Sequence, residues 1–213
     1  MNSISTCIGH KGGALMTIDA TQRSASFQLI LETTEQLIKE KGCRQTTLQD
    51  IIERTGLSKG AIYHYVSGKD ELMGLILKSK AEAMNDQFNE AVASTKGPDA
   101  SLPIQSITTG IFAHTDDADV SNKIFTYLLS QNDHPKVAAM MRDLYDFSLQ
   151  MAVRWIEVGQ NAGAIPASVD AKQAATMFLT YTYGLRVQNV IAKDAEGALK
   201  GNDVFRFILR SLM

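Results

Sequence analysis

GLSKGAIYHYVSGKDELM, residues 56–73, is the stretch that decides the fold. Gly56 ends one helix, because glycine adopts the left-handed conformation after a helix without strain. Ser58 then caps a helix of about eight residues, and Gly68 ends it. A helix this short is unstable alone in water, since roughly 12–15 residues are needed. Its neighbours in the chain must therefore hold it in place.

Two further helices are predicted before this stretch. Apolar residues recur at helical spacing from residue 24 to residue 41, and Gly42 follows as a stop. Thr47 and Asp50 form a capping-box-like start for the next helix, whose buried stripe is Leu48, Ile51 and Ile52. Two helices joined by a three- to four-residue turn that contains glycine make a helix-turn-helix pattern.

The short helix has two unlike faces at 100° per residue. Ile62 and Val66 lie on the face that can pack on the preceding helix. The face left outward carries Lys59, Gly60, Tyr63 and His64. These residues suit a DNA major groove, since Lys59 can reach guanine or phosphate and Tyr63 a thymine methyl. Lys69 opens the next helix, where its side chain and free N–H groups favour phosphate.

The rest of the chain reads as helices separated by short breaks. A long helix runs from residue 69 to about residue 94, and the linker STKGPDASLP follows at 94–103. Further helices are predicted at about 104–115, 119–132, 135–163, 170–194 and 202–212. No stretch alternates long enough to predict a strand, so the expected fold is all-α with about nine helices. The expected parts are a tail or upstream start at 1–20, a helix-turn-helix domain at 21–68, a connecting helix at 69–94 and a second domain at 95–213.

Composition limits the class of protein. The 213 residues include 45% apolar residues, and the net charge is −2. Residues 1–80 hold ten basic and eight acidic side chains, whereas residues 81–213 hold eleven and fifteen, so the first part is the more basic. Two cysteines, Cys7 and Cys43, suit a reducing cytoplasm. No apolar run reaches the 18 residues typical of a membrane span, and the first residues do not resemble a signal peptide. We therefore expect a cytoplasmic protein without a membrane partner.

The motifs of residues 48–72 resemble those of the TetR family of bacterial repressors. The resemblance rests on LQDI (48–51), TGLSKG (55–60), AIYHYV (61–66) and KDEL (69–72). It implies DNA contacts at or near Thr47, Ser58, Lys59, Gly60, Tyr63, His64 and Lys69. For Tyr65 two alternatives stay open, because the helical wheel puts it on the packing side and the family places it near phosphate. Ile52 and Val66 depart from the family's usual alanine and phenylalanine.

The second domain is rich in aromatic residues and methionine, which pack cores but also line pockets for flat apolar ligands. The resemblance favours a pocket, and the candidate lining residues are Phe112, Phe125, Tyr145, Trp155, Phe178 and Tyr181. Arg154 is a candidate for an anionic ligand or a surface ion pair. The last two helices are apolar over wide arcs that a two-fold dimer would cover. The candidate dimer contacts are Leu179, Gly184, Phe205, Ile208 and Leu209.

Nothing in the sequence predicts catalysis. The four histidines are isolated, no pair has metal-ligand spacing, and no phosphate loop or nucleophile elbow occurs. We expect no catalytic residues, no metal and no cofactor. The sequence favours a homodimeric repressor that binds double-stranded DNA at a palindromic operator and is released by a small apolar or aromatic effector. The alternatives are an activator or co-repressed regulator, or a helical carrier or enzyme in which the helix-turn-helix pattern is accidental.

Overall fold

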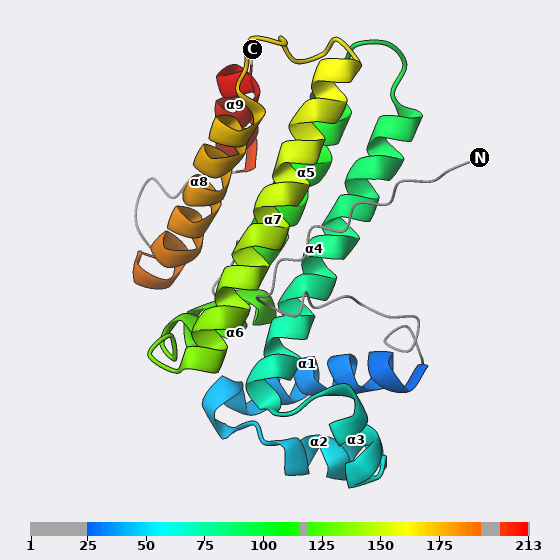
Figure 1. The fold of residues 1–213 in the computed structure, drawn as a ribbon, viewed down its shortest axis with the longest axis vertical. Coiled ribbons are helices and arrows are strands. Elements are labelled where there is room, and N and C mark those ends of the chain that lie inside the picture. The colour runs from blue at the N-terminus through cyan, green and yellow to red at the C-terminus, as the bar shows by residue number, and fades with distance from the viewer. Residues whose placement is uncertain (1–24, 116–118, 193–200, 213) are drawn as a thin grey trace, which may run out of the picture.

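The computed structural model describes residues 25–115, 119–192 and 201–212, and within these ranges the chain forms nine helices and no strand (Figure 1). The helices are α1 (Ala25–Gln45), α2 (Leu48–Thr55), α3 (Lys59–Tyr65), α4 (Lys69–Ser94), α5 (Ser101–Thr115), α6 (Val120–Leu129), α7 (Pro135–Asn161), α8 (Ala171–Ile191) and α9 (Gly201–Leu212). The predicted all-α fold is confirmed. The predicted tail at residues 1–20 lies outside the described part of the chain.

Helices α2 and α3 begin and end where local rules place them. Thr47 caps α2 in a capping box, in which Asp50 accepts the Thr47 N–H and donates its own N–H to the Thr47 hydroxyl oxygen. Gly56 follows α2 in the left-handed conformation, with a φ of 68°. Ser58 caps α3, and its Oγ accepts the N–H of Ala61 at 3.2 Å. Short-range hydrogen bonds therefore fix both helices.

The predicted boundaries agree with the structure within three residues, except at the end of α1. Helix α1 continues beyond Lys41 to Gln45, with a kink at Gly42, whose φ is 79°. Helix α5 starts at Ser101 instead of 104, because the Asp99 carboxylate accepts the Ser101 N–H at 2.8 Å and proline is tolerated in a first turn. Part of the predicted linker is thus helical.

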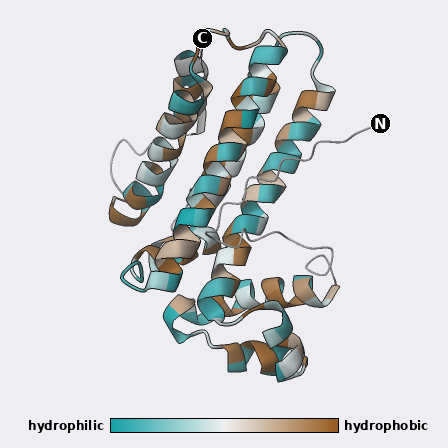
Figure 2. Ribbon diagram, viewed as in Figure 1, coloured by the Kyte–Doolittle hydropathy of each residue, from teal (hydrophilic) through white to brown (hydrophobic). Residues whose placement is uncertain are grey.

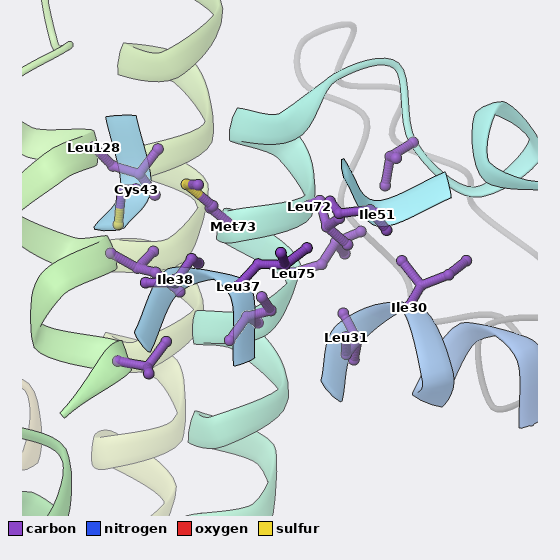
Figure 3. Packing of buried hydrophobic residues seen from close by; sticks show 14 of the residues in the cluster. Ile30, Leu31, Leu37, Ile38, Cys43, Ile51, Leu72, Met73, Leu75 and Leu128 are labelled. Carbon is purple, nitrogen blue, oxygen red and sulfur yellow. The ribbon is translucent and has the colours of Figure 1, made fainter. Parts of the chain in front are cut away.

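The first three helices pack across one end of α4 and share a core with α6 and the start of α7. Figure 3 shows its side chains gathered between α1 and α4, among them Ile30, Ile38, Ile51, Leu72 and Met73. All five are completely buried. Ile62 and Val66, predicted to anchor α3, belong to the same core with 0% and 2% exposure. This packing fixes α3 relative to α4.

The remaining helices form a bundle in which α4, α5 and α7 run alongside one another and α8 and α9 lie beside them (Figure 1). A second core joins them, with Phe88 of α4, Ile104 of α5 and Trp155 of α7 among its buried members. Apolar and polar segments alternate along the long helices, as expected for helices with one inner face (Figure 2). None of the helices in the described ranges is both long and apolar enough to cross a bilayer.

Candidate nucleic-acid interface and ligand cavities

The outer face of α3 carries the four residues that the sequence predicted to enter a DNA groove. These residues, all exposed, are Lys59, Gly60, Tyr63 and His64. Ile62 on the opposite side is completely buried, so core packing determines which face points outward. The Lys59 ammonium lies 5.6 Å from the centre of the Tyr63 ring, so a cation and a phenol form one exposed group. The face offers positive charge, hydrogen-bond donors and an aromatic surface to base edges.

The sequence left two roles open for Tyr65, namely packing against the core and contact with a phosphate. Its ring is half-buried and packs against the first core, with its centre 5.3 Å from that of Phe27 and 5.2 Å from that of His64. The ring therefore has the packing role that the helical wheel predicts. A phosphate contact through its hydroxyl stays a prediction.

Two hydroxyl residues flank the exposed face of α3, and both serve as helix caps. Ser58 accepts a hydrogen bond from α3, while the Thr47 hydroxyl donates to an Asp50 carboxylate oxygen at 2.6 Å. The other Asp50 oxygen lies 2.7 Å from the Lys41 ammonium, and this hydrogen bond is the main reason that the pKa of Asp50 is lowered to about 2. Local capping accounts for the positions of both hydroxyls, and their contacts with DNA stay predictions.

Lys69 has a structural role that the sequence did not reveal. Its ammonium donates to the backbone carbonyl oxygens of Cys43, Arg44 and Thr46 at 3.1–3.2 Å. These carbonyls follow the kink at Gly42, at the C-terminal end of α1, where helix carbonyls lack partners within the helix, so the cation caps it. The sequence shows the helix stop at Gly42, but Lys69, which caps the helix, lies more than 20 positions later in the chain. The phosphate contact predicted for Lys69 stays a prediction beside this cap.

A cavity of about 560 Å³ lies in the bundle, and no residue of α3 is part of its lining. Residues from α4, α5, α7, α8 and α9 line it, and three of them were predicted from sequence: Trp155, Phe178 and Tyr181. The Trp155 indole donates to the Asn85 side-chain oxygen at 2.9 Å, which fixes the ring. Among the described residues, Asp99 is the only charged one in the lining. The cavity therefore suits an apolar molecule.

A smaller cavity of about 100 Å³ lies on the other side of Trp155 and Phe178, which line both. The predicted residue Phe125 lines it, whereas Tyr145 lies beside Tyr183, with ring centres 6.3 Å apart, outside both linings. The side chain of Phe112 lies outside the described residues. Sequence reasoning missed several wall residues, namely Phe88, Ile104, Ile107, Phe207 and Arg186. A helical apolar stripe does not distinguish a cavity wall from a filled core.

Two of the five predicted dimer contacts are buried within the chain, and the other three stay predictions. Leu179 and Ile208 are only 5% and 7% exposed, because they pack inside the chain and line the cavities. Gly184 lies on the exposed side of α8, with open space around it, and the side chains of Phe205 and Leu209 are outside the described residues. The exposed face of α8 presents instead apolar side chains that the prediction omitted: Met177, Val187, Val190 and Ile191. These side chains make the exposed face of α8 a candidate surface for pairing.

Comparisons with known proteins relate both parts of the chain to transcription factors. Residues 30–76 match the sequence profile of bacterial regulatory proteins of the tetR family. An uncharacterized HTH-type transcriptional regulator of Bacillus subtilis, YfiR, is 25% identical over 171 residues, which cover 79% of this chain and 82% of the relative. The HTH-type transcriptional repressor KstR2 of Rhodococcus jostii is 25% identical over 169 residues, 73% of this chain and 76% of the relative.

Solved structures agree in fold. A TetR transcription regulator from Haloarcula marismortui superposes with a TM-score of 0.65 at 19% identity, covering 88% of this chain and 97% of the other. A TetR-family regulator from Syntrophomonas wolfei gives the same TM-score at 19% identity over 86% and 91% of the two chains. The similarity in fold thus extends beyond the matched residues 30–76 into the helical bundle.

Proposed function

Because the chain belongs to the TetR family of bacterial transcriptional regulators, we propose that this DNA-binding regulator is a repressor that a small apolar ligand releases from a palindromic operator. A transcription regulator of this family is not an enzyme, which removes the carrier or enzyme alternative. The observation that supports the proposal most is the exposed face of α3. Lys59 and Tyr63 are exposed on this face, while Ile62 on the opposite side of the helix is completely buried. KstR2, a relative of similar length, is itself a repressor.

In this proposal residues 21–68 bind DNA, residues 69–94 connect, and residues 95–213 bind the effector and form the dimer. Helix α3 enters the major groove, with Lys59, Tyr63 and His64 at base edges and Gly60 allowing close approach. Thr47, Ser58 and the hydroxyl of Tyr65 contact phosphates from the rim of the groove. Lys69 adds positive charge near the backbone while it caps α1.

A homodimer follows from the need to read enough bases. One seven-residue helix contacts few base pairs, whereas two copies spaced about 34–36 Å apart read two half-sites of a palindrome. The exposed side of α8 supports this pairing, since Met177, Gly184, Val187 and Ile191 are exposed at spacings of three, four or seven residues along one helix face. Burying this face against a second copy would remove apolar surface from water.

Helix α4 connects the ligand to the DNA. Phe88 and Val92 near its end line the larger cavity, while Leu72 and Met73 at its start lie in the core that holds α1 and α2. A ligand that fits better when α4 is displaced would favour dimers whose α3 helices are spaced wrongly for the operator. Its effect on DNA affinity equals its difference in affinity for the two arrangements and no more.

The test is binding to DNA from upstream of the protein's own gene, measured by fluorescence anisotropy at low salt with the purified dimer. We expect saturable binding that competitor DNA of unrelated sequence does not displace. If the folded dimer does not bind this DNA, the proposed operator upstream of the protein's own gene is wrong. Apolar probe compounds are then added to the complex with DNA. If they tighten DNA binding, the ligand acts as a co-repressor and the proposed release is wrong.

A further inference from the structure

Arg186 of α8 is a partly buried cation whose Nη1 atom is shielded from solvent. Its guanidinium lines the smaller cavity, and burial lowers its pKa because the charged form loses hydration. No hydrogen-bond partner for its Nη1 occurs among the described residues, and none of their carboxylates lies within ion-pair distance. The guanidinium carbon lies 5.0 Å from the centre of the Phe125 ring, which offers only a cation–π contact.

This arrangement is costly for the folded chain alone. Arginine stays protonated in proteins, so it cannot escape burial by losing its charge. Asp119 attracts Arg186 from a distance, but its carboxylate accepts the Ser121 N–H at 2.7 Å as the cap of α6. The Ser121 hydroxyl is itself buried, is part of the same cavity wall and has no partner in the part of the chain that the structure describes. Two such polar groups on one cavity wall are unusual in a native interior.

The two cavities differ in the sign of the charges on their walls. The smaller contains Lys80 and Arg186 and, among the described residues, no carboxylate. Lys80 is already paired with Glu35 at 2.9 Å, so Arg186 is the cation that remains for a ligand. The larger cavity holds no cation in its described lining. Trp155 and Phe178 form the wall common to both, with ring centres 6.1 Å apart.

We propose that the smaller cavity is the head-group subsite of the effector, and that it binds a carboxylate through Arg186 and Ser121 while an apolar body extends past Phe178 into the larger cavity. A volume of about 100 Å³ holds a head group and not a whole ligand, since ligand sites usually measure about 300–1,000 Å³. A flat carboxylate matches the guanidinium fork with two parallel hydrogen bonds. The effector class is therefore an apolar monocarboxylic acid, and this inference rests on the ligand-release function proposed above.

Trp155 is a built-in reporter for the experiment. It is the only tryptophan of the chain and lies on the wall shared by the two cavities, so its fluorescence changes when either is filled. Decanoate, decanol and decylamine are titrated as probes with matched chains and different head groups. We expect decanoate to bind roughly ten- to hundredfold more tightly than decanol, because hydrogen bonds to a charged group increase affinity by about this factor. Decylamine should bind most weakly, because its cation meets Arg186.

Arg186→Met tests the residue, and Arg154→Met is its control, since Arg154 is exposed on α7 and lines neither cavity. The preference for decanoate should disappear in Arg186→Met and persist in Arg154→Met. Unliganded Arg186→Met should melt no lower than the wild type, because a buried unpaired charge has been replaced by an apolar chain of similar length. Should that variant fail to fold, Arg186→Lys keeps the charge, loses the fork and should show a reduced preference.

The outcomes separate this inference from the proposed function. Equal affinities for decanoate and decanol in the wild type, an unchanged preference in Arg186→Met or Arg186→Lys, or no binding of decanoate would each overturn the subsite. If decanol binds as well as decanoate and also releases DNA, the proposed function holds and the subsite is wrong. If decanoate is preferred through Arg186 but leaves DNA binding unchanged, the subsite holds and ligand release is wrong.

Discussion

The core around helices α1–α3 and the core of the helical bundle are both apolar, but they differ in how completely they are filled. Ile30, Ile38, Ile51 and Ile62 are completely buried, and α1–α3 line neither the larger nor the smaller cavity. The bundle instead contains a cavity of about 560 Å³. The difference fits the proposed function, because a helix that binds a DNA groove needs one fixed position, whereas a ligand site needs space that the protein itself leaves empty.

The largest expected effect tests whether the first core is as tightly filled as it looks. Ile62→Ala should lower the free energy of unfolding by about 2–5 kcal/mol, because the lost side chain leaves a void beneath a seven-residue helix. Phe178→Ala is the comparison in the bundle. Phe178 is half-buried beside existing empty volume, so about 1–2 kcal/mol is expected. Urea unfolding followed by circular dichroism measures both, and equal losses would contradict the contrast between the two parts.

The next effect separates recognition from stability. Lys59→Ala and Tyr63→Ala remove exposed side chains, so stability should change by no more than about 0.5 kcal/mol. Operator affinity should fall by about 1–3 kcal/mol for each, as for other base contacts. Arg154→Ala, an exposed cation of the bundle, is the control and should leave the affinity unchanged. A similar loss in the control would show that general positive charge, and not the face of α3, determines binding.

Lys69→Met probes the junction between the two parts. The loss of an ammonium that caps three carbonyls should cost about 1–2 kcal/mol of stability, reduced from the value for buried charged hydrogen bonds because Lys69 is partly exposed. If Lys69 also contacts phosphate, the slope of log affinity against log salt should decrease by about one. An altered sequence preference with an unchanged slope would rule out the phosphate contact.

The sequence predicted α1–α3 more fully than the bundle, for a physical reason. Thr47, Gly56 and Ser58 act through hydrogen bonds and backbone conformations within four residues, so the pattern contains the cause. Helix α3 then has only two faces, and the burial of Ile62 settles which one is exposed. The Lys69 cap was missed because its acceptors lie more than 20 residues earlier.

In the bundle the sequence predicted helices but not the space between them. Trp155 and Phe178, predicted as ligand contacts, line the cavities, whereas Leu179, one position further and predicted at the dimer surface, packs inside the chain. Both stripes of α8 are apolar, so periodicity alone does not tell which one meets the chain's own core. The sequence did not predict Arg186 as a cavity residue for a related reason, since a charged residue on an apolar helix is expected to be exposed. Only the fold reveals that its Nη1 atom is buried beside the smaller cavity.

The smallest expected effect concerns a cap of the well-predicted part and can be separated from the others by pH. The Lys41 ammonium, followed by the Thr47 hydroxyl, holds the pKa of Asp50 at about 2, below the unfolded value of about 3.9. A folded pKa below the unfolded one means that the ionised carboxylate stabilises the fold above about pH 4, and that this stabilisation is lost as the pH falls through 2. Asp50→Asn should therefore be less stable than the wild type at pH 7, and the difference should shrink below pH 4. A difference that stays constant down to pH 2.5 would show that the carboxylate's charge contributes nothing to the cap.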